Sequence, residues 1–436
     1  MPTPSLTTAL HGPALTFTGD PFVAGVPAAM RYESDAIVAM ADGRITAFGP
    51  AGAVRGRLPP GTHIKECGRD ALILPGFIDC HVHYPQTQII GAYGQQLLDW
   101  LEKYTFVAEQ QFADPAHARA VANLFLDECL RNGTTTVASF CTVHAHSADA
   151  FFEAAAARGM RVIGGKCLMD RHAPIALLDS AQRGYDESKT LIARWHGKGR
   201  ALYAITPRFA ISSTPEQMAA AGALWKEHPG TYLQSHVSEN RAEVELARQI
   251  YPNRDGYLDI YDHYGHLGPR AIYGHGIWLT EGELKRLHET GTAIAHCPTS
   301  NMFLGSGLFD LRHAKQHDRP VRVGLATDVG AGTSLSMLKT MGSAYQVAQL
   351  GGHPLSAPLA LYLATRGAAN ALYLEDKIGS LAEGMEADVV VMNLKSTPLI
   401  EFRMKRSASI EEALFVQMTM GDERAIAERY VAGRLV

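Results

Sequence analysis

The sequence lacks the features that mark membrane, secreted and nucleic-acid-binding proteins. Basic residues are not in excess, since 40 Lys and Arg stand against 44 Asp and Glu for a net charge of −4. This balance gives no basic surface for a nucleic acid polymer or an anionic membrane. No apolar run is long enough to span a bilayer, and residues 1–19 contain no Lys or Arg and no continuous apolar run, unlike a signal peptide. We therefore expect a cytoplasmic protein that binds neither membrane nor polymer.

Cysteine-based sites are also missing. The 6 Cys are scattered and form no CxxC pair, which favours reduced thiols over a disulfide framework or a thiolate metal cage. The HxE and PCxxC signatures of the zinc deaminases that act on cytosine and on tRNA adenine are absent. No Gly-rich nucleotide loop follows the first strand.

Both ends of the chain are rich in short strand patterns. ALTFTG, AIVAMADGRITAFGP and ALILPGF alternate with turn residues, and ADVVVM and RYVAGRLV repeat the pattern near the other end. The Asp-Gly pair in ADGRI favours a tight hairpin. We expect residues 1–74 and 379–436 to form one small β domain.

Between these ends, apolar strand patterns alternate with helical ones. Eight such runs are GFIDCHVH, TTTVASFCT, RVIGGKCLM, ALYAITPRF, YLQSHVSEN, AIYGHGI, TAIAHCPTS and VRVGLATDV. Eight strands alternating with helices indicate an α/β fold of the (β/α)₈ TIM-like barrel type over residues 75–378. An open doubly wound sheet is the alternative, but it usually has fewer strands.

A His-x-His motif ends the first of these strands. His81 and His83 are two residues apart, so their side chains point to the same side of a strand. At the carboxyl end of a barrel strand they face the mouth where barrel enzymes keep their active sites. The alternative for either imidazole is a hydrogen-bonded core residue.

Three more ionisable residues end other strands. His236 ends the fifth strand, His275 the sixth and Asp328 the eighth. Imidazoles and a carboxylate at one barrel mouth suit Zn²⁺ or Fe²⁺ in a site that keeps a position open for water. Such an ion lowers the pKa of its water towards about 7. Glu239 lies where it could reach this water, as a general acid/base, unless it is only a solvated residue of a helix start.

Several segments in this order are similar to the amidohydrolase superfamily. They are PGFIDCHVH, SHVSEN, GHG, HCPTSN and TDVGAG. More narrowly, QQLLDWLEKYTFVAEQQF, NGTTT, TPRFAIS, QSHVSENRAEVE and SMLKT resemble the guanine deaminase family. The resemblance implies a distorted barrel with a small β-sandwich made from both chain ends, one divalent metal per chain, usually Zn²⁺, and a homodimer.

The resemblance also implies the parts that individual residues play. His81, His83, His236 and Asp328 match the family's metal ligands, and His275 matches the histidine that polarises the attacked centre. Glu239 matches the proton-shuttling glutamate, so Glu239, His275 and Asp328 are the expected catalytic residues. The expected substrate contacts are those of Gln86, Trp100, Arg208 and Phe209, together with His236 and His275.

The fourth strand favours one metal over two. Relatives with two metals carry a carbamylated lysine there, whereas ALYAITPRF offers Arg208, which cannot lose its proton. Lys166 on the third strand is better explained as a packed or ion-paired lysine. Arg208 suits guanine, whose adjacent O6 and N7 acceptors match the guanidinium fork. A structural ion pair is the alternative for Arg208.

The sequence therefore predicts hydrolysis of guanine to xanthine and ammonia by hydroxide on a metal. Two alternatives stay open. One is another aminohydrolase of the superfamily, acting on an oxidised purine, a pterin or a triazine. The other is a relative that keeps the fold for binding or assembly without catalysis, which the intact metal-ligand pattern disfavours.

Overall fold

The computed structural model describes residues 7–94 and 96–436. Residues 1–6, which belong to the segment interpreted as lacking a signal peptide, lie outside the described residues. So does Gln95, the first residue of the QQLLDW segment.

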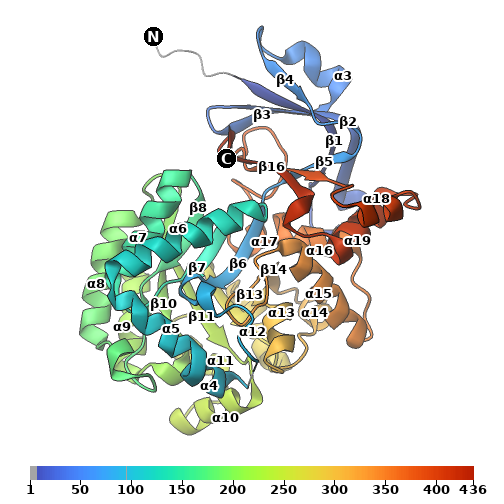
Figure 1. Ribbon diagram of the computed structural model, residues 1–436. Coiled ribbons are helices and arrows are strands. Elements are labelled where there is room, and N and C mark those ends of the chain that lie inside the picture. The colour runs from blue at the N-terminus through green and yellow to red at the C-terminus, as the bar shows by residue number, and fades with distance from the viewer. Residues whose placement is uncertain (1–6, 95) are drawn as a thin grey trace.

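A sheet of parallel strands forms the larger part of the molecule (Figure 1). Its eight main strands run in the order β6-β7-β8-β10-β11-β12-β13-β14, and the two-residue β9 (Cys167–Leu168) pairs with β10. All eight predicted strands are confirmed. Their bounds are β6 (Phe77–His83), β7 (Thr134–Phe140), β8 (Arg161–Gly165), β10 (Ala201–Pro207), β11 (Tyr232–Val237), β12 (Ala271–His275), β13 (Ala293–His296) and β14 (Arg322–Leu325).

The sheet curls into a nearly closed barrel. The N–H of His83 donates to the carbonyl of Val329 at 2.7 Å, and the N–H of Asp328 donates to the carbonyl of His81 at 3.0 Å. These two hydrogen bonds join β6 to the segment after β14, so the first and last strands lie beside each other. The predicted (β/α)₈ fold is confirmed, and its first and last strand ends bring His81, His83 and Asp328 together.

Helices follow the strands and cover the outside of the barrel (Figure 1). Three of them begin at N-capping side chains, because Asp114, Thr214 and Thr280 accept backbone N–H groups at the starts of α6, α9 and α12. The longer helices around the barrel are α6 (Pro115–Arg131), α7 (Ala145–Arg158), α8 (Ala181–Trp195), α9 (Pro215–Glu227), α10 (Arg241–Ile250), α11 (Tyr257–His263), α12 (Glu281–Thr290), α15 (Met337–Leu350), α16 (Ala357–Ala364) and α17 (Arg366–Ala371).

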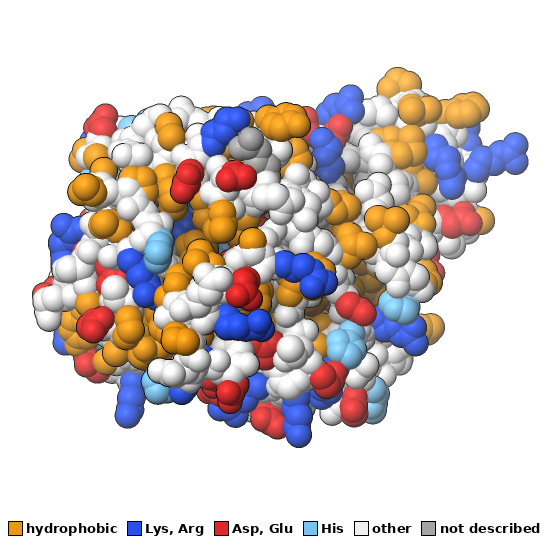
Figure 2. Space-filling view, turned by 90° about the horizontal axis from the view of Figure 1, so that it is seen from below, with side chains coloured by type: hydrophobic (Ala, Val, Ile, Leu, Met, Phe, Trp, Pro, Cys, Tyr) orange, Lys and Arg blue, Asp and Glu red, His pale blue; other side chains and the backbone are white. Residues whose placement is uncertain are grey.

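A helical segment after β6 lies on the lower side of the barrel, away from the end sheet (Figure 1). It contains α4 (Leu97–Trp100), one π-helical turn over Leu101–Thr105 and α5 (Phe106–Gln110). We call residues 97–110 the cover segment. Figure 2 views this lower side, where acidic and basic side chains are interspersed. No helix in the described part of the chain is long and apolar enough to cross a membrane.

Strands from both ends of the chain form the second sheet, as expected. It is mixed, with the order β17-β16-β15-β5-β1-β2-β3 and with β4 paired to β1. Its strands are β1 (Thr8–Phe17), β2 (Met30–Ala41), β3 (Arg44–Pro50), β4 (His63–Glu66), β5 (Ala71–Pro75), β15 (Val389–Asn393), β16 (Ile426–Val431) and β17 (Arg434–Leu435). The division into domains at residues 74 and 379 stays our proposal.

An ion-pair cluster connects the two sheets. Arg161 in β8 and Arg200 just before β10 both donate to the carboxylate of Glu386, Arg161 from Nε at 2.8 Å and Arg200 from Nη2 at 2.6 Å. Arg200 also pairs with Asp388. Because these four side chains are at most 15% exposed, the pairs are screened less than surface ion pairs.

Candidate active site

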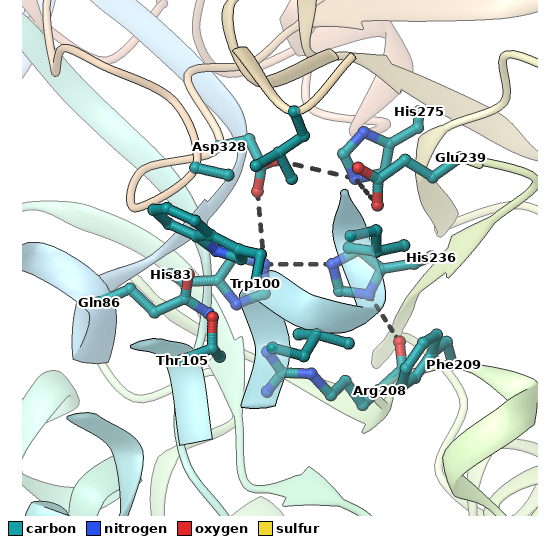
Figure 3. A pocket seen from close by; sticks show the side chains of 14 residues that line it. His83, Gln86, Trp100, Thr105, Arg208, Phe209, His236, Glu239, His275 and Asp328 are labelled. Carbon is teal, nitrogen blue, oxygen red and sulfur yellow. Dashed lines mark hydrogen bonds and ion pairs between the residues drawn. The ribbon is translucent and has the colours of Figure 1, made fainter. Parts of the chain in front are cut away.

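Five side chains of types that can bind a metal meet at the carboxyl ends of the barrel strands. His81 and His83 come from the end of β6, His236 from β11, His275 from the last position of β12, and Asp328 from just after β14. All five are buried. The strand-end positions predicted from sequence therefore converge on one point, and Figure 3 shows four of these side chains facing each other.

The distances within this group are those of a metal site. Ligand atoms of His81, His236, His275 and Asp328 all lie within 4.8 Å of one another. Nε2 of His83 is 3.1 Å from Nε2 of His236 and 3.4 Å from Oδ1 of Asp328.

Hydrogen bonds from Nδ1, on the side of the ring away from the cluster, fix the orientation of two imidazoles. Nδ1 of His236 donates to the carbonyl of Arg208 at 2.6 Å, and Nδ1 of His275 donates to Oδ1 of Asn301 at 2.7 Å. Each ring therefore turns its Nε2 towards the centre of the site. Such a bond from the other nitrogen is the usual support of a metal-ligating histidine.

The same region contains an orphaned nitrogen. Among the described residues, the buried Nε2 of His81 has no hydrogen-bond partner. Nε2 of His236 and Nε2 of His83 face each other at 3.1 Å, so either His83 carries its proton on Nε2 or a cation lies near both nitrogens. The donor set of imidazole nitrogens and one carboxylate thus fits a divalent transition-metal ion.

Burial keeps the imidazoles in the form that binds metal. It lowers the pKa of His81, His83 and His236 below the ordinary value of a histidine, so these rings are neutral at pH 7. For Asp328, burial would raise the pKa, but the adjacent imidazole of His81, 3.4 Å away, and the charge of His275 outweigh it and lower the pKa to about 2. The site therefore offers neutral nitrogens and an ionised carboxylate.

Glu239 lies at the edge of this cluster. Its Oε2 is 3.4 Å from Nε2 of His275, and its Oε1 accepts a hydrogen bond from the hydroxyl of Ser306 at 3.0 Å. Burial raises the pKa of Glu239 to about 7. A carboxyl group with this pKa can both accept and release a proton near neutral pH.

The backbone around the cluster is strained in a way typical of functional sites. Ser238, His275 and Asp328 all have positive φ angles, of 51°, 74° and 50°. Residues with a Cβ rarely adopt this conformation, which costs about 1–2 kcal/mol each. Strand-end positions that keep this strain are held by the surrounding contacts, here including the Asn301 bond to His275.

A close approach of β12 to β6 also needs a glycine. A Cβ at Gly274 would lie 2.7 Å from Cε1 of His81 and 3.0 Å from its Nε2. No side chain fits there unless the imidazole of His81 moves, so Gly274 leaves the room in which this ring lies.

A pocket opens from the cluster towards the cover segment (Figure 3). It contains nine of the ten predicted site residues, and the tenth, His81, lies behind it against Asp328 at 3.4 Å. The pocket is lined by His83, Gln86, Leu97, Trp100, Leu101, Thr105, Arg208, Phe209, His236, Glu239, His275, Leu304, Asp328 and Ala331.

Arg208 lines this pocket and is also in an ion pair. Its Nη1 donates to both carboxylate oxygens of Glu109, at 2.9 Å each, and the two side chains are 3% and 1% exposed. Burial would lower the pKa of Arg208, but the charge of Glu109 outweighs it and raises the pKa above its ordinary value. The ion pair that the sequence analysis gave as the alternative role of Arg208 is thus present, and the same side chain also lines the pocket.

Sequence reasoning missed three residues that hold the site. Glu109 pairs with Arg208, Asn301 orients His275, and Ser306 binds Glu239. Asn301 belongs to the HCPTSN segment and could have been suspected from it. Glu109 could have been sought because a buried Arg208 needs an anionic partner, yet the two are 99 residues apart.

Lys166 has the structural surroundings expected of it. Its Nζ lies 2.5 Å from Oδ2 of Asp179 and 3.1 Å from the carboxylate of Glu187, and it donates to the carbonyl of Val143. It takes no part in the pocket.

Known proteins share this architecture over nearly the whole chain. The model of the amidohydrolase family matches residues 72–436. Guanine deaminase of Escherichia coli K12 is 48% identical over 411 residues, covering 94% of this chain and 93% of that protein. The solved structure of E. coli guanine deaminase has a TM-score of 0.96 at 47% identity and covers 98% of this chain and 99% of that chain.

A guanine deaminase from C. acetobutylicum, solved with guanine in its active site, is also similar. Its TM-score is 0.87 at 27% identity, with 99% of this chain and 100% of that chain covered. The predicted family is confirmed by these matches. A metal-dependent fold, a buried cluster of imidazoles with a carboxylate, and the extent of these similarities lead to one conclusion: the chain belongs to the amidohydrolase family and, within it, to the guanine deaminases.

Proposed function

We propose that this enzyme hydrolyses guanine to xanthine and ammonia. The observation that carries the proposal is the placement of Arg208 and Glu239 in one buried pocket with the imidazole–carboxylate cluster. The similar C. acetobutylicum guanine deaminase, which holds guanine in its active site, supports the choice of substrate.

One divalent ion per chain would be held by His81, His83, His236 and Asp328, whose neutral nitrogens and ionised carboxylate suit Zn²⁺, with Fe²⁺ as the alternative. Such an ion supplies a nucleophile at neutral pH by lowering the pKa of a water molecule. The fourth barrel strand, β10, and the Arg208 that follows it offer no lysine that could be carbamylated to bridge two metals, which favours a single ion.

Glu239 would move the protons of the reaction. Its carboxylate borders both the cluster and the pocket, so it can take a proton from water and give it to the ring nitrogen beside C2. Addition of water at C2 and loss of the amino group as ammonia then balance the reaction as guanine plus water giving xanthine plus ammonia.

His275 would stabilise the negative charge that develops when water adds at C2, and His275 and Asp328 together would assist the collapse of the tetrahedral intermediate. Nε2 of His275 is 3.4 Å from Glu239 and 3.7 Å from Oδ2 of Asp328, so it lies between the proton carrier and the carboxylate. The Asn301 bond keeps this nitrogen directed into the site. A donor prepared in this orientation needs no reorganisation during the reaction.

The pocket walls would select the base. Trp100 from the cover segment and Phe209 after β10 provide aromatic faces, while Gln86 and Arg208 provide polar groups. The donors of Arg208 match the O6 and N7 acceptors of guanine, whereas the amino group of adenine would leave them unpaired.

Two further properties are proposed from the family resemblance: a homodimer and a cytoplasmic location. Light scattering on the purified protein checks the first, and a mass of one chain would contradict it. Fractionation of the source cells checks the second.

A panel of ammonia-release assays tests the function. Guanine should yield ammonia and xanthine, while adenine, cytosine and guanosine should react poorly. Release from an oxidised purine, pterin or triazine, with none from guanine, would contradict the proposal and assign the enzyme to another aminohydrolase activity.

A further inference from the structure

Glu109 is a buried carboxylate behind the wall of the pocket. It lies in α5, where it is 1% exposed, with Phe106, Ala108 and Phe112 as buried neighbours along the chain. An ionised carboxylate in such surroundings is costly unless charged and hydrogen-bonding partners surround it. The role of Glu109 can therefore be inferred from the residues that pair with it.

Those partners are two polar residues of the pocket wall. Nη1 of Arg208 donates to Oε1 and Oε2 at 2.9 Å each, and Nε2 of Gln86 donates to Oε1 at 3.1 Å. Gln86 and Arg208 come from different parts of the barrel, after β6 and after β10. One carboxylate thus holds both side chains.

The contact with Glu109 also determines which end of the Gln86 amide faces the pocket. A carboxylate paired with a guanidinium only accepts hydrogen bonds, so Gln86 must turn its NH₂ group towards it. The amide oxygen then faces the other way and accepts a hydrogen bond from the N–H of Gly330 at 3.4 Å. Its second lone pair is the acceptor that Gln86, which lines the pocket, has left for a ligand.

The pairing with Arg208 leaves donors for a ligand. Both hydrogen bonds to Glu109 use Nη1, and a guanidinium has five N–H donors on three nitrogens. The wall therefore presents donors from Arg208 beside an acceptor from Gln86. Guanine carries the complementary set, since its acceptors O6 and N7 adjoin the N1–H donor.

Glu109 further ties the cover segment to the barrel. The residue lies in α5, which continues the helical path that carries Trp100 and Thr105 into the pocket. Its ion pair with Arg208 joins this path to the end of β10, where the Arg208 guanidinium also lies over the ring of Phe106.

We propose that Glu109 is a positioning residue for base recognition: it fixes the guanidinium of Arg208 and the amide of Gln86, and so sets the donor and acceptor pattern that selects the purine. The inference rests on the proposed function, which names guanine as the ligand. Glu109 does not line the pocket and acts through its two partners.

Steady-state kinetics of Glu109→Gln tests the proposal. A neutral amide of the same size leaves the buried charge of Arg208 unpaired. Because this amide can also donate a hydrogen bond, the side-chain amide of Gln86 is no longer held in one orientation and can flip. We expect kcat/KM for guanine to fall about 100-fold, with most of the loss in KM, because the cluster and Glu239 are untouched. The matched control is Glu102→Gln in the same segment, whose side chain is exposed. It should stay within about threefold of the wild type.

Three additional variants and one structure separate positioning from simple stability. Glu109→Asp keeps the charge and should retain a higher kcat/KM than Glu109→Gln. If the glutamine variant does not fold, Glu109→Asp is compared with the wild type and with Glu102→Gln instead. Because Arg208 is one of the two residues through which Glu109 acts, the loss caused by Glu109→Gln should be smaller in an Arg208→Ala background than in the wild type. In a crystal structure of Glu109→Gln, the Arg208 guanidinium or the Gln86 amide should have moved.

These experiments distinguish a failure of the positioning assignment from a failure of the proposed guanine substrate. Kinetics of Glu109→Gln equal to those of Glu102→Gln, with Arg208 and Gln86 in place, would overturn the positioning assignment. If the wild type does not act on guanine but the two side chains move in the crystal, the proposed substrate fails and the positioning assignment stands.

Discussion

His236 donates its Nδ1–H to the backbone carbonyl of Arg208 at 2.6 Å, and its backbone N–H donates to the same oxygen at 3.2 Å. One residue at the end of β10 therefore supports an imidazole of the cluster through its backbone and faces the pocket with its side chain. The position of the cluster relative to the Arg208 side chain is therefore set by the neighbouring strands β10 and β11.

Specificity should depend on the guanidinium of Arg208. Arg208→Ala should lower kcat/KM for guanine by about 2–4 kcal/mol of transition-state stabilisation, because buried charged hydrogen bonds are lost. Arg208→Lys should recover little, since an ammonium cannot make the planar two-point contact. Exposed Arg248 provides a control as Arg248→Ala. If Arg208→Ala kept its preference for guanine over adenine, the base would be read elsewhere, with Gln86 the next candidate.

Proton transfer should depend on Glu239. Glu239→Gln keeps the size of the side chain but removes its basicity, so kcat should fall by about 10²–10⁴-fold while bound metal and guanine affinity are retained. The measurements are kcat and the metal content of the purified variant, and the first should fall while the second is unchanged. Glu245 is exposed, so Glu245→Gln is the matched control. A variant as fast as the wild type would move the assignment to Asp328.

Metal affinity should depend on the space that Gly274 leaves for His81. In Gly274→Ala the new methyl would overlap Cε1 of His81 at 2.7 Å, so the ring must shift and the affinity for the ion should drop about 10–100-fold. Competition with a chelator measures the change. Gly282→Ala is the control, because a Cβ there meets nothing within 4 Å. Equal affinities in both variants would refute the role of this close approach.

Acid stability should depend on Glu386, which joins the two sheets. Burial would raise the pKa of Glu386, but Arg161 and Arg200 outweigh it and lower the pKa below the ordinary 4.5. Its stabilising effect is therefore complete above about pH 4.5 and is lost as the pH falls through the lowered folded-state pKa.

Denaturation in urea at several pH values measures this dependence. Glu386→Gln should lose about 1–3 kcal/mol at pH 7, and its difference from the wild type should shrink as the pH falls below 4.5. Glu411→Gln, at an exposed position, should leave the curve unchanged. A Glu386→Gln protein as stable as the wild type at pH 7 would show that the ion pairs add nothing net.

The sequence predicted the barrel because its strands carry a regular signal. Eight apolar runs, each followed by a helical pattern, correspond one by one to β6–β8 and β10–β14. His81 and His83 were predictable for the same reason: a strand alternates its side chains, so the face of one imidazole determines the face of the other.

The supporting contacts were not predictable from local patterns. Glu109 and Arg208 are 99 residues apart, and Ser306 and Glu239 are 67 apart. No periodicity links such pairs, because barrel closure and the path of the cover segment bring them together. The orientation of the Gln86 amide likewise follows from a neighbour that only the folded chain supplies.

The most direct test of the account is a titration of metal-free protein with Zn²⁺, in which xanthine formation from guanine and bound zinc are measured together. The account predicts no turnover without the ion, a linear rise with occupancy and a plateau at one ion per chain. His81→Ala should neither retain the ion nor turn over guanine. Full activity without metal, or a plateau at two ions, would contradict the single-metal site built by His81, His83, His236 and Asp328.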